Sequence, residues 1–220
     1  QLSGTTALTR VITASEGIEN LQFSKDDELD AALILSGRVS YQPQGRYCFQ
    51  TTYLNNSYPE YFEHTDYKLI WVLRNPSSVI YSMLYNWKHS ALNRLFRHCG
   101  VELLEDNERW LYDHFGTFSI TRLRRACLSY NAKISQILAL REKLGEDRLF
   151  IIEYDELIRN KDIMLPRIYQ FIDLSYRKEY SEKLHSGSFN KARKFHAKHE
   201  ALLGNVCMPV YEKACTLLSI

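Results

Sequence analysis

The segment Tyr67–Ser82, with the sequence YKLIWVLRNPSSVIYS, constrains the fold of this chain more than any other. Its first half, Tyr67–Leu73, is apolar apart from Lys68, rich in β-formers and without the alternation of a half-exposed strand, so it predicts a strand covered on both faces. Asn75 can then cap a helix whose first residue is Pro76. Arg74 is therefore expected at the carboxyl end of a buried strand, the edge at which open α/β sheets bind ligands.

A phosphate group is the natural ligand for Arg74 in this setting. An arginine offers a planar fork of donors, and a helix start adds backbone N–H groups and the positive end of the helix dipole. Ser82 is expected two turns into the same helix. An arginine that only ends the strand, or pairs with a surface carboxylate, would give the same local pattern.

The first residues of the chain favour the phosphate interpretation. Ser3-Gly4-Thr5-Thr6 leads into residues with the apolar spacing of a helix, and such a turn leaves N–H groups beside hydroxyls that can hold phosphate or sulfate oxygens. A nucleotide triphosphatase would have Gly-Lys-Ser/Thr here, and the lysine is missing. A strand normally precedes this kind of loop, so we expect the first strand of the sheet to lie upstream of Gln1.

The remaining chain alternates predicted strands and helices. Arg46–Thr51 and Arg148–Tyr154 predict two further buried strands, and a long helix is expected from Ser119 until Gly145. This order predicts one α/β domain over residues 1–220, with a parallel β-sheet flanked by helices on both faces. Other expectations are a first helix ended by Gly17, a helix from Pro76 through Trp87 towards Cys99, an irregular insertion over Gly100–Gly116, and helices over Ile163–Ile172 and Val206–Ile220.

Composition narrows the possible partners. The net charge is only +2, which gives no reason to expect nucleic acid, and no apolar run approaches the length of a transmembrane segment. The five cysteines form no CxxC pair, and no carboxylate or histidine cluster has the spacing of metal ligands. We therefore expect reduced thiols, no metal site and a cytoplasmic protein.

With these pieces in place, the chain resembles the PAPS-dependent sulfotransferases, which transfer a sulfuryl group from 3′-phosphoadenosine 5′-phosphosulfate (PAPS). Ser3–Thr6 resembles the family loop that holds the 5′-phosphosulfate, and Ile70–Pro76 together with Ser82 resembles the 3′-phosphate site. Ile152–Leu157, followed by Phe171–Leu174, is similar to a later family strand and its sequel. The resemblance implies a P-loop-like sulfotransferase fold and a donor site formed by Ser3, Gly4, Thr5, Thr6, Arg74, Ser82, Tyr154 and, in a late basic loop, Arg193.

Two departures from the family pattern concern the chemistry. Leu2 stands where the family has a lysine or arginine, and Phe49–Thr52 stands where the family strand ends in a base or a leaving-group lysine. Gln50 can hydrogen-bond a sulfate oxygen but supplies no charge. Glu19 and His64 are the candidates for a general base, since such a base needs position first and a suitable pKa second. For both, a solvated surface residue is the competing interpretation.

The resemblance implies transfer of a sulfuryl group to a hydroxyl or amine of a small-molecule, lipid or glycan acceptor, without a metal. A catalytically inactive relative that keeps the nucleotide-binding cleft is a second possibility, because the usual base and lysine are absent. A P-loop nucleotide kinase is a third, disfavoured by the missing lysine and by the lack of a clear magnesium carboxylate after a strand.

Overall fold

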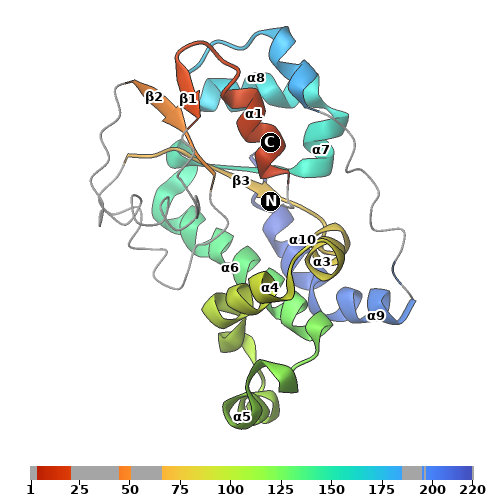
Figure 1. Cartoon of the computed structure of the whole chain (residues 1–220). Coiled ribbons are helices and arrows are strands. Elements are labelled where there is room, and N and C mark those ends of the chain that lie inside the picture. The colour runs from red at the N-terminus through yellow and green to blue at the C-terminus, as the bar shows by residue number, and fades with distance from the viewer. Residues whose placement is uncertain (1–3, 21–44, 51–65, 185–194, 196, 220) are drawn as a thin grey trace.

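The computed structural model describes residues 4–20, 45–50, 66–184, 195 and 197–219, and helices dominate this part of the chain (Figure 1). Two short parallel strand pairs lie among the helices. The helices and strands are α1 (Thr5–Ile12), β1 (Ile18–Asn20), β2 (Arg46–Cys48), β3 (Leu69–Leu73), α3 (Pro76–Tyr85), α4 (His89–Leu95), a π-helix (Phe96–Gly100), α5 (Asp106–Phe115), α6 (Arg122–Arg148), β4 (Leu149–Glu153), α7 (Tyr154–Arg159), α8 (Lys161–Phe171), α9 (Ala197–Val206) and α10 (Met208–Cys215).

The pair β3–β4 forms the centre of the molecule. The strands run parallel, with Leu69 opposite Leu149 and Leu73 opposite Glu153. Alternate residues of the two strands contribute to two separate cores. One core lies against α3, α6 and α10, and the other lies against α1, α7 and α8. The predicted parallel strands with helices on both faces are therefore confirmed.

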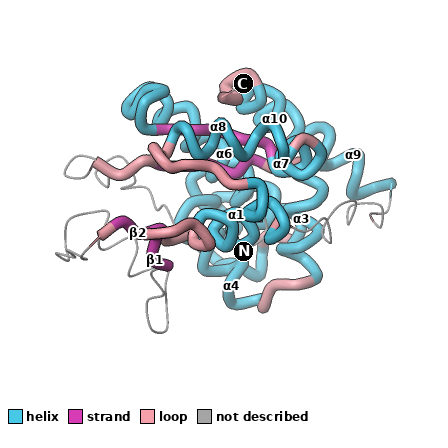
Figure 2. The backbone as a smooth tube through the Cα atoms, turned by 90° about the horizontal axis from the view of Figure 1, so that it is seen from above, coloured by secondary structure: helices cyan, strands magenta, loops and turns pink. Residues whose placement is uncertain are grey.

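A cavity separates the two strand pairs, which Figure 2 shows as separate magenta segments. Its volume is about 440 Å³, and it is lined by α1, by β2 and the residues after it, and by β3. At the amino end of the strands, two cations bind the carbonyls that end α8. Arg46 donates to the carbonyls of Ile172 and Asp173, and Lys68 donates to that of Phe171 at 2.6 Å. Cations at a helix C-terminus complement its dipole.

The long helix α6 follows the expected pattern closely. Thr121 caps it by accepting a hydrogen bond from the Arg124 N–H. At Gly145 the backbone leaves helical geometry, with φ 66° and ψ −171°. This is the left-handed φ that glycine tolerates best, so Gly145 interrupts the helix as predicted, although a last turn continues to Arg148.

Three predicted helix boundaries are wrong. α1 ends at Ile12 rather than near Gly17, and Ile18–Asn20 forms a strand. The helix after Pro76 stops at Tyr85, because Lys88 adopts an extended conformation and starts α4 as its N-cap. The helix predicted over Val206–Ile220 covers only Met208–Cys215, and Pro209 lies in its first turn, where proline fits.

Two further expectations need correction. The strand predicted over Arg46–Thr51 covers only Arg46–Cys48. The insertion expected to be irregular contains α5, which begins with a capping box: the Glu105 side chain accepts from the backbone of Glu108, and the Glu108 side chain accepts from the backbone of Glu105. The acidic bias of this segment is thus the signature of a helix start, which two glutamates three residues apart could have revealed.

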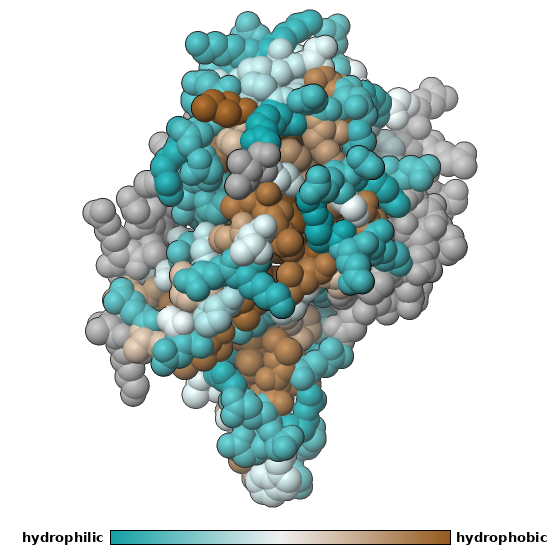
Figure 3. Space-filling model, turned by 180° about the vertical axis from the view of Figure 1, so that it is seen from behind, coloured by the Kyte–Doolittle hydropathy of each residue, from teal (hydrophilic) through white to brown (hydrophobic). Residues whose placement is uncertain are grey.

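The surface seen from behind is largely hydrophilic, with apolar side chains gathered through its middle (Figure 3). Near the C-terminus, Ser219 pairs with Ile151 of β4: the Ser219 N–H donates to the Ile151 carbonyl at 2.9 Å, and the Ile151 N–H donates to the Ser219 hydroxyl at 3.0 Å. Across the described ranges, no helix is both long and apolar enough to span a bilayer.

Candidate functional site

Arg74 directly follows the carboxyl end of β3, which lies beside the carboxyl end of β4. The next residues start α3 as predicted, since the Asn75 side chain accepts from the Ser77 N–H at 2.9 Å and Pro76 is the first helical residue. The Arg74 side chain is only 5% exposed. The predicted strand before Arg74 and the capped helix directly after it are confirmed. The strand is shorter than the predicted Tyr67–Leu73, since β3 begins at Leu69, and only Val72 and Leu73 in it are buried.

Tyr154 contacts both Arg74 and Gly4. The centre of the Arg74 guanidinium lies 4.6 Å from the centroid of the Tyr154 ring, a cation–π contact. The backbone at Gly4 also approaches the ring, so closely that a Cβ there would overlap it. The φ of Gly4 is 91°, which also favours glycine. The three segments that resemble the family motifs therefore meet around one buried aromatic ring.

The start of α1 lies at this meeting point (Figure 1). The Gly4 carbonyl accepts the first helical hydrogen bonds, from the N–H groups of Ala7 and Leu8 at 3.0 and 3.1 Å. The N–H groups of Thr5 and Thr6 precede this ladder and have no partner within the helix. The Thr5 hydroxyl is buried and makes no hydrogen bond to the residues that the structure describes. A helix start of this kind offers donors to an anion.

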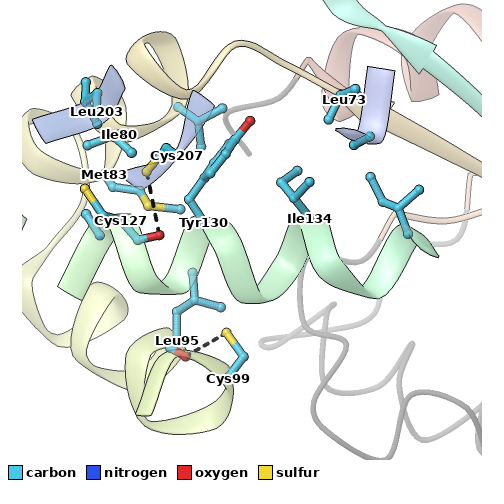
Figure 4. Close-up of a cluster of buried hydrophobic side chains, with 14 of the residues drawn as sticks. Leu73, Ile80, Met83, Leu95, Cys99, Cys127, Tyr130, Ile134, Leu203 and Cys207 are labelled. Carbon is cyan, nitrogen blue, oxygen red and sulfur yellow. Dashed lines mark hydrogen bonds between the residues drawn. The ribbon is translucent and has the colours of Figure 1, made fainter. Parts of the chain in front are cut away.

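Acidic and aromatic side chains surround Arg74. Asp155 places a carboxylate oxygen 3.8 Å from its guanidinium. Tyr130 of α6, which Figure 4 shows among the core side chains, donates its hydroxyl to the Arg74 carbonyl at 2.8 Å. Glu153, 9% exposed, caps α7 by accepting from the Glu156 N–H at 2.7 Å. Burial raises the pKa of the Glu153 carboxyl, and the nearby Asp155 charge raises it further.

The other predicted site residues are more dispersed. Ser82 is buried on α3, and its hydroxyl accepts from the Asn86 side chain at 2.8 Å. Glu19 is exposed on β1, whereas its neighbour Ile18 packs into the core. Gln50 lines the cavity, and its side-chain oxygen is buried without a hydrogen bond to the described part of the chain. Ser3, His64 and Arg193 lie outside the described residues.

Sequence reasoning missed three of the groups around Arg74. Tyr130 lies on the long predicted helix, and the helical pattern alone does not show where its hydroxyl points. Asp155 and Glu153 flank Tyr154, so their proximity to Arg74 becomes clear only when the pairing of β4 with β3 is known. That pairing cannot be read from either strand alone.

The donors gathered at this site suit an anion. The site combines a buried guanidinium with the N–H groups of a helix start, which donate hydrogen bonds and accept none, and with hydroxyls, which can do both. In the part of the chain that the structure describes, no group of three histidine, cysteine, aspartate or glutamate side chains is placed to hold a metal ion.

Fold and site together define an α/β protein with hydrogen-bond donors gathered at the carboxyl ends of two parallel strands. The family model described as "Sulfotransferase domain" matches residues 3–207, so the chain belongs to the sulfotransferase family. Among solved structures, it is similar to a sulfotransferase domain from the curacin biosynthetic pathway, with a TM-score of 0.55 and 13% identity over 99% of this chain and 94% of the other. At that identity the likeness concerns the fold. A comparison with curated proteins found no match.

Proposed function

We propose that this chain transfers a sulfuryl group from PAPS to the hydroxyl or amine of an acceptor. The observation that carries the proposal is the arrangement of Gly4, Tyr154 and Arg74, because a helix start and a buried guanidinium both contact one ring. PAPS carries two anionic groups, a 5′-phosphosulfate and a 3′-phosphate. Two neighbouring donor sets match a ligand of that kind.

The first donor set is the start of α1. In the proposal, the N–H groups of Thr5 and Thr6, with the hydroxyls of Ser3, Thr5 and Thr6, hold the 5′-phosphosulfate. The buried Thr5 hydroxyl, which makes no hydrogen bond to any described residue, is available for this task. When PAPS is bound, it supplies the sulfuryl group, and negative charge builds on the leaving phosphate oxygen. Fixed N–H donors at that oxygen would lower the barrier.

The second donor set reads the 3′-phosphate. Arg74 supplies a charged fork, Ser82 supplies a hydroxyl two turns along α3, and Arg193 belongs to the same proposed site. Tyr154 keeps the guanidinium plane fixed through the stacking contact at 4.6 Å. Tyr130 fixes the backbone of Arg74 through its hydrogen bond to the carbonyl. An arginine that is held at its side chain by Tyr154 and at its backbone by Tyr130 loses less freedom when it binds a phosphate.

The general base and the acceptor belong to the proposal as well. Glu19 and His64 are the proposed base candidates. The acceptor is proposed to be a small molecule, lipid or glycan. Five free cysteines, three of them buried, suit a reducing compartment, and we therefore propose a cytoplasmic location.

A second candidate function is nucleotide binding without turnover. It is favoured by the exposure of Glu19 on β1 and by Gln50, an uncharged residue, on the cavity wall where the family has a charged one. Both functions predict the same nucleotide affinity. Only turnover of PAPS in the presence of candidate acceptors separates them.

The test is calorimetry with 3′,5′-adenosine bisphosphate and, separately, with ATP and magnesium. We expect the bisphosphate to bind, whereas preferential binding of ATP with magnesium would contradict the proposal and favour a kinase. Arg74→Ala should weaken bisphosphate binding by about 1.5–3 kcal/mol and Ser82→Ala by about 0.5–1.5 kcal/mol. Both variants should largely spare adenosine 5′-phosphosulfate, which lacks the 3′-phosphate.

A matched control is Arg159→Ala. Arg159 lies on α7 close to the site in sequence, but it is 59% exposed and pairs with Glu156. Its loss should leave both affinities unchanged. Equal weakening of the two nucleotides by Arg74→Ala would show that Arg74 does not read the 3′-phosphate. Because Arg74 is buried, Arg74→Lys and a thermal melt of each variant distinguish lost contacts from lost structure.

A further inference from the structure

We propose that Asp155 limits the affinity of the 3′-phosphate site by competing with the phosphate for Arg74. This inference rests on the proposed function and names a residue that sets how tightly the spent donor, 3′,5′-adenosine bisphosphate, is held. Asp155 carries a negative charge at a site whose ligand is itself an anion.

The geometry places Asp155 directly against the binding cation. Its carboxylate oxygen lies 3.8 Å from a terminal nitrogen of Arg74, and its side chain is only 18% exposed. The Tyr154 ring covers the guanidinium at the same time. Asp155 and Tyr154 are consecutive at the start of α7, so a single helix turn presents both of them to Arg74. A carboxylate in that first turn is stabilised by the helix dipole.

The sign of the effect follows from the charges. Arg74 and Asp155 together are close to neutral, so a phosphate that binds Arg74 gains the attraction of one cation and meets the repulsion of one carboxylate. Charges a few ångströms apart and largely shielded from water interact strongly compared with exposed pairs. The phosphate must therefore share the guanidinium with Asp155 or displace it. Either way, its affinity is lower than Arg74 alone would give.

This competition has a use in a transferase. A product that keeps both phosphate groups of the donor is held by the same contacts as the donor, and slow release of such a product limits turnover. A carboxylate that takes over the guanidinium as the phosphate leaves would speed release. Arg74 would then pass between two anions and would not be left as an isolated buried charge, which is costly.

The test compares Asp155→Asn with Glu156→Gln in the full chain. Asparagine keeps the size of the aspartate side chain and removes its charge. Glu156 is the matched control, because it lies next along the same turn and carries the same charge, but its carboxylate contacts Arg159 at 3.6 Å and the Asn160 side chain. Calorimetry with 3′,5′-adenosine bisphosphate and with adenosine 5′-phosphosulfate gives the affinities, and stopped-flow displacement gives the release rate of the bisphosphate.

We expect Asp155→Asn to bind the bisphosphate about tenfold more tightly and to release it correspondingly more slowly, with a much smaller change for adenosine 5′-phosphosulfate. Glu156→Gln should change neither affinity. Unchanged or weaker bisphosphate binding by Asp155→Asn would overturn the inference, since Asp155 would then be neutral or would only position Arg74. An equal gain for both nucleotides, or the same gain from Glu156→Gln, would also overturn it.

The outcomes separate this inference from the proposed function. If the unaltered chain binds no bisphosphate, the proposed function fails and the inference fails with it. If it binds in a manner that depends on Arg74 while Asp155→Asn gives no gain, only the inference fails. A thermal melt of each variant checks folding, and Asp155→Ser repeats the comparison if the asparagine variant does not fold.

Discussion

A single methyl group added at Gly4 should test whether the Tyr154 ring links the loop to Arg74. Gly4→Ala has two separable costs. A non-glycine residue at a φ of 91° is strained, by about 1–2 kcal/mol in the left-handed region. The new Cβ would also overlap the Tyr154 ring, which is 2% exposed and contacts the Arg74 guanidinium, so the ring has little room to move. Overpacking of this kind costs about 1–3 kcal/mol.

Gly17→Ala isolates the second cost. Gly17 has a φ of 77°, but nothing lies within 4 Å of a Cβ at that position. It should therefore show only the backbone strain. Urea denaturation followed by circular dichroism should find Gly4→Ala less stable than Gly17→Ala by about 1–3 kcal/mol. Equal destabilisation of the two variants would refute the contact.

A double variant sharpens the same argument. Tyr154→Ala removes the ring that the methyl group would meet, so Gly4→Ala should cost less in that background than in the unaltered chain. Residues in direct contact give non-additive changes in the free energy of unfolding, whereas independent residues give additive ones. Additive costs would mean that Gly4 and Tyr154 do not meet.

Three further predictions concern the surroundings of the site. Burial raises the pKa of the Glu153 carboxyl, so this group stabilises the fold below the usual glutamate pKa, and the contribution is lost as the pH rises through the raised value. Glu153→Gln should therefore raise the melting temperature at about pH 8 and lose that advantage at about pH 4. Tyr130→Phe removes the hydrogen bond to the buried Arg74 carbonyl, so it should lower the free energy of unfolding by about 1 kcal/mol in urea denaturation and weaken bisphosphate binding. Unchanged bisphosphate affinity would show that this hydrogen bond does not position Arg74 for binding. The Arg124 hydrogen bond lowers the Glu108 pKa, so Arg124→Ala should destabilise by about 1 kcal/mol near pH 7, and melts at falling pH should show the difference disappearing below about pH 4.

The centre of the fold could be predicted because its sequence signals are local and agree with one another. Leu69–Leu73 is a run of apolar β-formers, and Asn75-Pro76 is an unambiguous helix start. Gly145 likewise interrupts α6, as expected of a glycine near the end of a helix. Each of these predictions depends on neighbouring residues and on no distant contact, and that is where sequence reasoning is strongest.

Other features depend on contacts between distant segments. The break after Tyr85 has no proline or glycine to announce it, and Trp87 continues the apolar pattern across it. In the candidate site, Arg74 and Gly4 were predicted as binding residues, but nothing in the sequence shows that both contact one ring. The ion pair between Arg74 and Asp155 joins positions 81 residues apart, and it becomes visible only when β3 and β4 are paired.

The pairing of Ser219 with Ile151 matters for anyone who handles this protein. A strand edge with unpaired backbone groups can pair with other chains. Ser219 provides hydrogen-bond partners for one backbone carbonyl and one backbone N–H of β4. A deletion that includes Ser219 would remove both partners. Such a deletion should therefore be watched for aggregation before any loss of activity is interpreted.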